Sequence, residues 1–304
     1  MVRTIKQAAV SAALLALMAL LLRHNAAVGQ AVRQGLLLCG TSVIPSLFPF
    51  LAAVSLAVAC GLFDFLRRLY LPVGAAVFLL GAAGGYPMGA RTAAELYRAG
   101  TISRPRAEGL LTFCNNAGPA FILSIAGVGI FGNQKIGWVL YGIHVLSALL
   151  AGGLLLRGFG ETGSGGNKGA ITPVYVPITP VNVPFSPAVF VSILRNTALT
   201  MVNICGFVIF FLALTTLFRQ LWPVVPPPLF GILELTVGIS ALKNDAVSFC
   251  AAAALLGWGG LSVHCQTAAV LEGTGLSLGR YLLAKALQAV VSALLALAVC
   301  RFLF

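Results

Sequence analysis

The stretch Leu79–Gly100 reads LLGAAGGYPMGARTAAELYRAG, and it contains an interruption near the centre of an apolar segment. Proline removes a helix hydrogen bond and clashes with the preceding turn, and glycine weakens a helix. Gly84, Gly85 and Pro87 therefore predict a break rather than one straight helix. The helix is expected to restart near Met88, with free backbone N–H groups and the positive end of its dipole at the break.

The composition around this stretch excludes a soluble globular enzyme. The 304 residues are 59% hydrophobic and 9% charged, with a mean hydropathy of +1.00, whereas a soluble domain has about 25% charged residues. About 20 apolar residues are needed to cross the hydrocarbon core. Nine segments approach this pattern: 7–22, 35–62, 72–98, 104–131, 134–157, 188–218, 228–242, 246–274 and 276–303.

Three further segments contain similar interruptions. They are marked by Pro45 with Pro49, by Gly118 with Pro119, and by the glycines of 257–260. Broken backbone at membrane depth persists only when it is buried in protein or lines a wet cavity. Four breaks in one chain therefore predict a central polar cavity.

The first break has a counterpart 175 residues further on. Residues 254–275 read ALLGWGGLSVHCQTAAVLEGTG, and seven positions of 84–100 coincide with it, including both glycines of the break. Chance similarity between Ala- and Gly-rich segments is the alternative explanation. Two halves with discontinuous helices are typical of secondary transporters, whose substrate site lies at the repeat interface.

The predicted fold is an all-α polytopic membrane protein of two pseudo-repeated halves with broken or re-entrant helices. We expect an N-terminal membrane helix and connector over 1–34, a first repeat over 35–157 and a second over 188–304. Between them, 158–187 is rich in Gly and Ser and then in Pro, which indicates a linker.

Charge and motifs exclude several functions. The 19 Lys and Arg against 7 Asp and Glu give a net charge of +12, but the basic residues are scattered between apolar segments, as topology determinants are. No nucleic-acid partner is expected. The seven cysteines form no CxxC pair, and no ATP-binding or hydrolase motif is present, so we expect neither a metal, a cofactor nor an enzyme.

Two breaks supply candidate substrate-binding groups. The helix start at 84–91 and its counterpart at 262–266 would aim N–H groups at an anion or a carbonyl-bearing ligand. Relief of packing is the alternative role for each break. The candidate residues are Gly85, Tyr86, Pro87, Gly89, Arg91, Ser262, His264 and Gln266.

Asn115 and Asn116, in FCNNAGPAF, are a third candidate group. Two adjacent amides in an apolar run are costly unless they are hydrogen-bonded, and each offers donors and an acceptor. They could bind a carboxylate, a pyridine or a purine edge, or they could cap the helix broken by Pro119. The sequence favours neither role over the other.

Glu234 is predicted to lie a few residues inside an apolar helix, where an ionisable group suggests proton or ion coupling. A shallow position at the membrane interface is the alternative. Arg91 and Arg195 are candidate counter-ions, although snorkelling to the headgroups explains either arginine equally well. His144 is interpreted as a packed helix residue rather than a proton relay.

The pieces GYPMGA and CNNAGP resemble the YlbJ-type sporulation integral membrane proteins, also called SpoVV. These carry nucleoside-recognition (Gate) domains related to concentrative nucleoside transporters. The resemblance covers about 35–158 and 188–304, and Gly85–Ala90 and Asn115–Pro119 carry it most specifically. It implies a multi-pass protein of the mother-cell membrane around the forespore that moves dipicolinic acid.

The leading hypothesis is a secondary transporter or facilitator of a small anionic metabolite, dipicolinate in particular. A nucleoside carrier is the first alternative, because amides alone suffice for it. A non-transporting scaffold that recruits other sporulation membrane proteins in the bilayer is the second.

Overall fold

The computed structural model describes residues 2–61, 65, 68, 70–98, 100–158 and 186–304, and all the regular elements in these ranges are helices. The predicted linker falls almost entirely on residues 159–185, which lie outside the described residues. The part before it contains α1 (Val2–Arg23), α2 (Asn25–Leu38), the π-helix η1 (Cys39–Val43), α3 (Ile44–Ala59), α5 (Val73–Gly84), α6 (Met88–Arg98), α7 (Arg104–Cys114), α8 (Pro119–Phe121), the π-helix η2 (Ile122–Ile130) and α9 (Gln134–Gly158). The part after it contains α10 (Pro187–Leu221), the 3-10 helix η3 (Pro227–Ile232), α11 (Leu235–Ser240), α12 (Ala246–Trp258), α13 (Gly260–Val270) and α14 (Gly279–Cys300).

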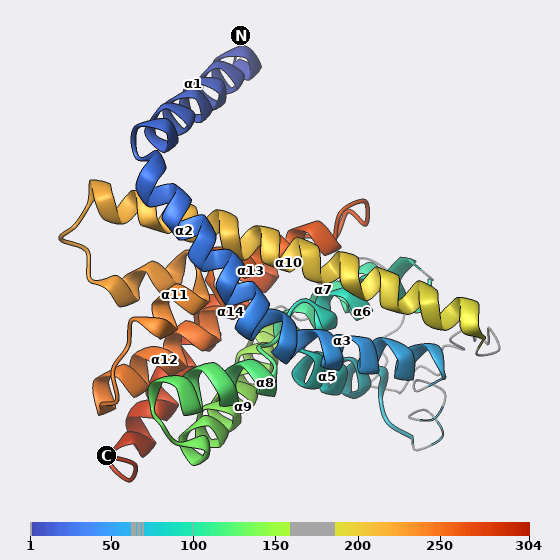
Figure 1. Ribbon diagram of the computed structural model, residues 1–304. Helices are drawn as coiled ribbons and strands as arrows, with labels where there is room; N and C mark the ends of the chain where they lie inside the picture. The colour runs from blue at the N-terminus through green and yellow to red at the C-terminus, as the bar shows by residue number, and fades with distance from the viewer. Residues whose placement is uncertain (1, 62–64, 66–67, 69, 99, 159–185) are drawn as a thin grey trace.

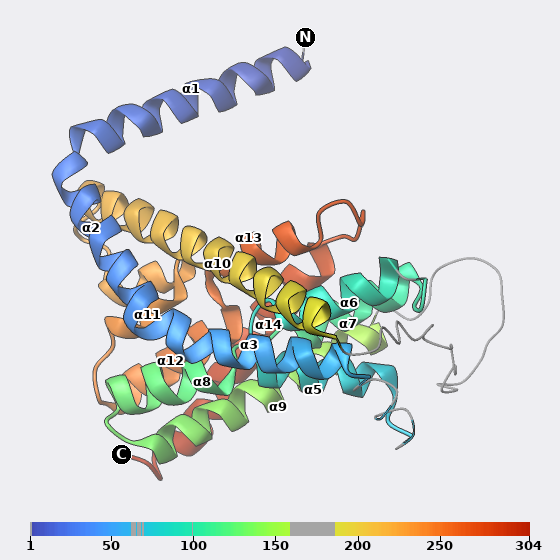
Figure 2. The same cartoon turned by 45° about the vertical axis from the view of Figure 1, so that its right-hand side comes forward.

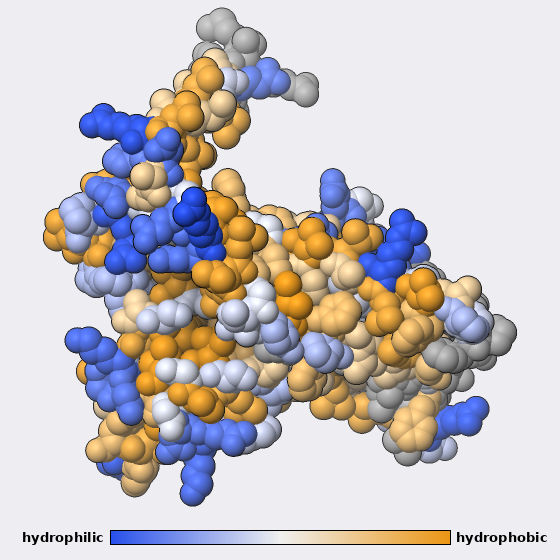
Figure 3. All heavy atoms as spheres, in the orientation of Figure 1, coloured by the Kyte–Doolittle hydropathy of each residue, from blue (hydrophilic) through white to orange (hydrophobic). Residues whose placement is uncertain are grey.

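Five stretches within the described residues are long and apolar enough to cross a membrane. They are Arg104–Ile130, Gln134–Leu156, Pro187–Leu221, Ala246–Val270 and Gly279–Cys300. A sixth candidate is the pair formed by α1 and α2, which is bent by 89°. Apolar side chains cover most of the middle of the face seen in Figure 3, with hydrophilic groups nearer its edges. The prediction of an all-α multi-pass membrane protein is confirmed.

The helices form two packed groups joined through the broken segments. α9, α12 and α14 pack together on one side, and α2 lies along α10 on the other (Figures 1 and 2). α7 packs against α14, α13 packs against α10, and α6 packs against both α7 and α13, so these three helices connect the groups. α1 projects away from the rest of the molecule (Figure 2). The predicted boundary between residues 34 and 35 falls inside α2.

Three of the four predicted breaks are present. The break expected at Pro45 and Pro49 is absent: α2, η1 and α3 follow one another without a gap from Asn25 to Ala59, and Pro49 lies inside α3. α5 ends before Gly85, which has a φ of +74°, and α6 restarts at Met88, as expected. α12 gives way to α13 at Gly259, whose φ is +90°. α7 stops at Cys114 and α8 begins at Pro119.

These three breaks meet in the interior. A Cβ added at Gly85 would lie 3.0 Å from the backbone N of Gly118, in the second break. A Cβ added at Gly259, in the third break, would lie 3.0 Å from the Tyr86 hydroxyl. Glycine is needed at Gly85 and Gly259 both for the positive φ and for this close approach. The centre of the molecule is therefore made of interrupted helices, as the sequence indicates.

The two matched segments are arranged differently. α5 and α6 pack against each other across their break, whereas α12 and α13 continue as one candidate span. The helices that follow the two matched segments have the same 175-residue spacing, because α7 begins at Arg104 and α14 begins at Gly279.

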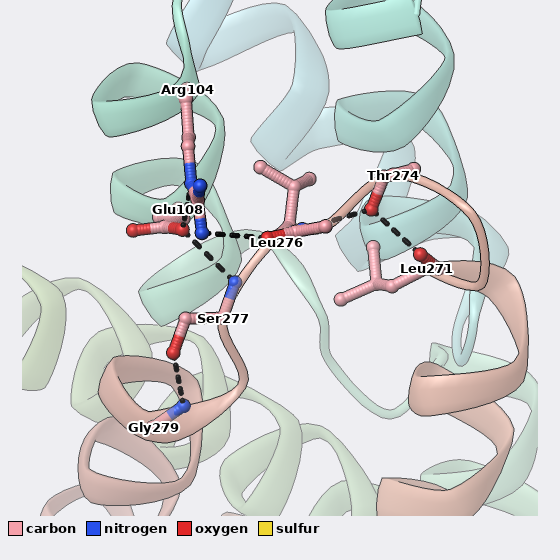
Figure 4. A network of polar contacts seen from close by, with 8 residues as sticks. Arg104, Glu108, Leu271, Thr274, Leu276, Ser277 and Gly279 are labelled. Carbon is pink, nitrogen blue, oxygen red and sulfur yellow. Dashed lines mark hydrogen bonds and ion pairs between the residues drawn. The ribbon is translucent and has the colours of Figure 1, made fainter.

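The start of α7 is tied to the loop before α14 (Figure 4). Arg104 pairs with Glu108 at 3.0 Å and donates to the Gly275 carbonyl at 2.6 Å. The Glu108 carboxylate also accepts from the backbone N of Ser277 at 2.9 Å. These contacts hold the start of α7 against the start of α14.

Glu234 does not lie inside an apolar helix, so that part of the prediction is wrong. The prolines before it begin the short helix η3, which ends at Ile232. Glu234 follows in extended conformation and caps α11, because its carboxylate accepts from the backbone N of Val237 at 2.7 Å. The apolar run is thus two short helices with Glu234 at their junction.

Candidate functional site

One face of α14 carries a polar stripe in an otherwise apolar helix. Tyr281, Lys285, Gln288 and Ser292 are spaced four, three and four residues apart, and all four are fully buried. With 3.6 residues per turn, this spacing places them on one side of the helix. Their partners lie on α9, on α13 and in the break after α7.

Lys285 is a buried cation within a candidate membrane span. Its Nζ donates to Gln288 Oε1 at 2.7 Å and to Asn116 Oδ1 at 3.3 Å, and it lies 5.5 Å from the centroid of the Tyr86 ring. All of these partners are neutral. Among the residues that the structure describes, no carboxylate forms an ion pair with Lys285. A buried charge without a counter-charge is costly, so an anion or loss of the proton must compensate it.

Asn115 joins the break after α7 to α13 and α14. Its Nδ2 donates to Thr267 Oγ1 at 2.8 Å and to the Tyr281 hydroxyl at 3.3 Å. The same hydroxyl lies 3.0 Å from His264 Nδ1 and 3.2 Å from Thr267 Oγ1. These four polar side chains, which come from three segments, therefore form one hydrogen-bond network.

Asn116 and His144 stabilise the broken backbone itself. Asn116 Nδ2 donates to the Phe113 carbonyl at 2.6 Å, at the end of α7. The backbone N of Ala117, which the break leaves outside any helix, donates to His144 Nε2 at 3.0 Å. Asn116 thus supports the end of α7, which is the capping role among the two that the sequence left open, and its Oδ1 also accepts from Lys285. Binding of substrate by Asn116 stays a prediction. His144 is buried, as expected, but it has a specific partner in the break.

The polar contacts continue along α9 and α14. Gln288 Nε2 donates to the His144 carbonyl at 3.1 Å, and Ser292 donates to Ser147 at 2.7 Å. Ser147 in turn donates to the His144 carbonyl at 2.9 Å. We call the set made of Tyr86, Asn115, Asn116, His144, Ser147, His264, Thr267, Tyr281, Lys285, Gln288 and Ser292 the Lys285 cluster.

Three atoms of the Lys285 cluster are buried without a hydrogen-bond partner among the described residues. They are the Tyr86 hydroxyl, Asn115 Oδ1 and His264 Nε2. A buried polar atom without a partner costs about 1–3 kcal/mol, so few persist without a reason. Together they offer a hydroxyl, an acceptor and a ring nitrogen to a ligand that reaches the Lys285 cluster.

The remaining sequence-predicted residues are divided between the breaks and a nearby groove. Pro87, Arg91 and Gln266 line a groove of about 360 Å³ between α6, α10 and α13. Ser262 is buried in α13 and accepts a long hydrogen bond of 3.4 Å from Gln266. The structure therefore places the predicted residues in two adjoining sets rather than in one.

The other predicted residues serve the backbone or lie apart. Gly85 and Gly89 permit close approach of backbone at the breaks. Arg195 is exposed on α10. No hydrogen bond within the described residues joins Glu234 to the Lys285 cluster.

The sequence reasoning missed Lys285 and the stripe around it. The signal was available, because four polar residues with 4-3-4 spacing in an apolar helix predict one buried polar face. The scatter of basic residues along the sequence instead indicates a topology role for Lys285. Its partner Asn116 lies 169 residues away in the sequence, and local patterns carry no information on that pairing.

Metal chemistry has no support from the described residues, which contain no group of three or more His, Cys, Asp or Glu placed to hold an ion. The Lys285 cluster offers one cation, three amides, five hydroxyls and two histidines in a buried setting. That set can recognise an anion or a polar ring by charge and hydrogen bonds.

The fold and this site define a multi-pass helical membrane protein whose interrupted helices surround a buried polar centre with one cation. The chain is similar to the sporulation integral membrane protein YlbJ of Bacillus subtilis (strain 168), with 28% identity over 321 residues. The alignment covers 91% of this chain and 78% of that protein. The similarity is thus to an integral membrane protein of sporulation, and the apolar helices of this chain agree with a membrane protein. No protein-family model matches the chain, and no solved structure matches it.

Proposed function

We propose that this protein is a secondary transporter or facilitator of a small anionic metabolite and that the Lys285 cluster is its binding site. The observation that carries the proposal is the burial of Lys285 among neutral partners within the described residues. In transporters, intramembrane ionisable residues mark substrate or ion pathways, and discontinuous helices surround the substrate. An anion bound at Lys285 would supply the counter-charge.

Dipicolinate is the proposed substrate. It is a dianion with a ring nitrogen, which suits one ammonium group together with amide and hydroxyl donors. The sporulation relative and the resemblance of GYPMGA and CNNAGP support this choice. The membrane proposed for the protein is the mother-cell membrane around the forespore. The halves 35–157 and 188–304 are proposed to be Gate-like repeats.

A nucleoside remains the second candidate substrate, because of Asn115 Oδ1 and the Tyr86 hydroxyl. Both are buried without partners among the described residues, and an acceptor oxygen suits a base N–H rather than a carboxylate. For a nucleoside, the charge of Lys285 would be dispensable. A scaffold for other sporulation membrane proteins would need neither the charge nor the unpartnered atoms.

The test is uptake of labelled dipicolinate and labelled uridine into proteoliposomes containing the purified protein. Lys285→Gln removes the charge and keeps a hydrogen-bonding side chain, and Lys243→Gln is the matched control in the exposed turn before α12. We expect dipicolinate uptake that Lys285→Gln loses and Lys243→Gln keeps. Uridine uptake alone, unaffected by Lys285→Gln, would establish the nucleoside alternative. Uptake of neither compound would contradict transport of these substrates.

The coupling role of Glu234 is tested in the same assay. Glu234→Gln keeps an acceptor for the Val237 N–H but cannot ionise. If Glu234 couples transport to protons, the variant should lose the pH dependence of uptake. An unchanged pH dependence would leave Glu234 only its role as the cap of α11.

A further inference from the structure

The groove between α6, α10 and α13 contains a polar stripe from α10, although α10 is an apolar membrane helix. Asn196, Thr200 and Asn203 follow each other by four and three residues along α10, and all three line the groove. Polar side chains with this spacing form one stripe, and such a stripe would be costly against lipid tails. We therefore expect the stripe to face water rather than lipid tails.

The opposite wall of the groove carries positive charge. Arg91 pairs with Glu95 at 2.8 Å and donates to Thr200 at 3.3 Å, so it spans the groove from α6 to α10. Arg98 donates to the carbonyls of Val270 and Glu272 at 3.2 and 2.8 Å. Two guanidinium groups and one carboxylate leave the groove with net positive charge.

Residues adjacent in the sequence contact the groove and the Lys285 cluster. Pro87 lines the groove, while its neighbour Tyr86 lies with its ring 5.5 Å from Lys285 Nζ. Gln266 lines the groove, while its neighbour Thr267 binds Asn115 in the Lys285 cluster. The same two chain segments therefore contact both places.

We infer that the groove is an outer binding site for the same class of small anion, and that Tyr86 is the partition between it and Lys285. The inference rests on the proposed function, since it assigns the groove as the approach to that site. The anion is first attracted by Arg91 and held by the amides of α10. Movement of Tyr86, whose hydroxyl has no partner among the described residues, then admits it to Lys285.

The test uses two variants that break the same ion pair with opposite effects on charge. Arg91→Gln removes the cation of the groove, whereas Glu95→Gln breaks the Arg91–Glu95 pair and leaves the cation. Initial rates of labelled dipicolinate uptake are measured over a range of concentrations, with Arg219→Gln as the control for loss of an arginine outside the groove. Arg219 lines a separate hollow between α2 and the end of α10.

We expect Arg91→Gln to raise the half-saturating concentration about fivefold or more, because a charged cleft concentrates its ligand. Glu95→Gln should leave it unchanged or lower it, and Arg219→Gln should leave it unchanged. Asn203→Leu, which leaves the ion pair intact, should act in the same direction as Arg91→Gln. If the ion pair had only a structural role, Arg91→Gln and Glu95→Gln would change the half-saturating concentration alike. That result would overturn the proposal of an outer site.

Equilibrium binding separates failure of this inference from failure of the proposed function. The outer-site variants should bind dipicolinate at equilibrium within about twofold of the wild type, since Lys285 remains. Unchanged uptake in Arg91→Gln and Asn203→Leu, with dipicolinate binding still dependent on Lys285, would refute the groove alone. Absence of dipicolinate binding and uptake in the wild type would refute both.

Discussion

At the scale of single residues, glycines set how closely the broken helices approach. A Cβ added at Gly81 or at Gly89 would collide with the carbonyl oxygen of Cys114, at the end of α7. The α5–α6 pair therefore packs directly onto the backbone that precedes Asn115 and Asn116. The position of both amides depends on this backbone contact.

Gly89→Ala should destabilise the protein by about 1–3 kcal/mol, because the methyl group must displace backbone rather than a flexible side chain. The measurement is the thermal unfolding temperature in detergent. Gly142→Ala is the control, since nothing lies within 4 Å of a Cβ added there and alanine favours the helix. Equal stability of the two variants would contradict the close contact.

Residues also show where sequence reasoning succeeded and where it could not. The breaks at Gly85 and Gly259 follow from local chemistry, and both were predicted. The pairing of Lys285 with Asn116 joins residues 169 apart, so it depends on the whole packing. The apolar neighbours of Glu234 predict a helix around it, but the preceding prolines begin a separate short helix.

At the scale of elements, the start of α12 depends on one carboxylate. Asp245 accepts from the backbone N of Ser248 at 2.7 Å as the cap of α12. That hydrogen bond lowers the pKa of Asp245 below its usual value of 3.8. A lowered pKa means that the ionised cap stabilises the fold above pH 3.8, and that this contribution is lost as the pH falls through the lower folded value.

Asp245→Asn should therefore differ from the wild type in pH dependence. Asparagine also caps helices but does not titrate. The difference in unfolding temperature between wild type and variant should be constant from pH 7 to about 5 and should shift against the wild type as the pH falls below about 4. A difference that stays constant to pH 3 would show that the Asp245 carboxylate has no such role.

The elements illustrate how far the sequence predicts architecture. The apolar segments correspond to helices or to helix pairs, because length and composition decide whether a segment can cross a membrane. The matched breaks do not predict shape, since α5 and α6 fold against each other and α12 and α13 continue as one span. That difference is decided by packing against neighbouring helices, and the matched residues carry no information on this packing.

At the scale of the whole molecule, α1 stands apart from the packed helices (Figures 1 and 2). Leu15 and Leu22 are 65% and 74% exposed, and α1 contacts little beyond the start of α2. Lipid, rather than protein, is expected to cover its apolar surface.

Removal of residues 2–23 should therefore leave the stability of the remaining protein nearly unchanged. The unfolding temperature in nanodiscs should fall by less than about 3 °C, the shift given by about 1 kcal/mol in a domain of 150–250 residues. A much larger fall would show that α1 packs against the other helices in the bilayer.

The whole molecule brings together a buried lysine, two asparagines and unpartnered polar atoms at the meeting point of its broken helices. The central claim is that this meeting point binds a small anion through Lys285. The most direct measurement is calorimetric titration of dipicolinate into nanodisc-embedded wild type, Lys285→Gln and the control Lys243→Gln.

Loss of a charge-assisted contact of about 1.5–3 kcal/mol should raise the Kd of Lys285→Gln at least about tenfold, while Lys243→Gln keeps the wild-type Kd. Equal dipicolinate affinity in all three proteins, or none in any, would contradict the claim.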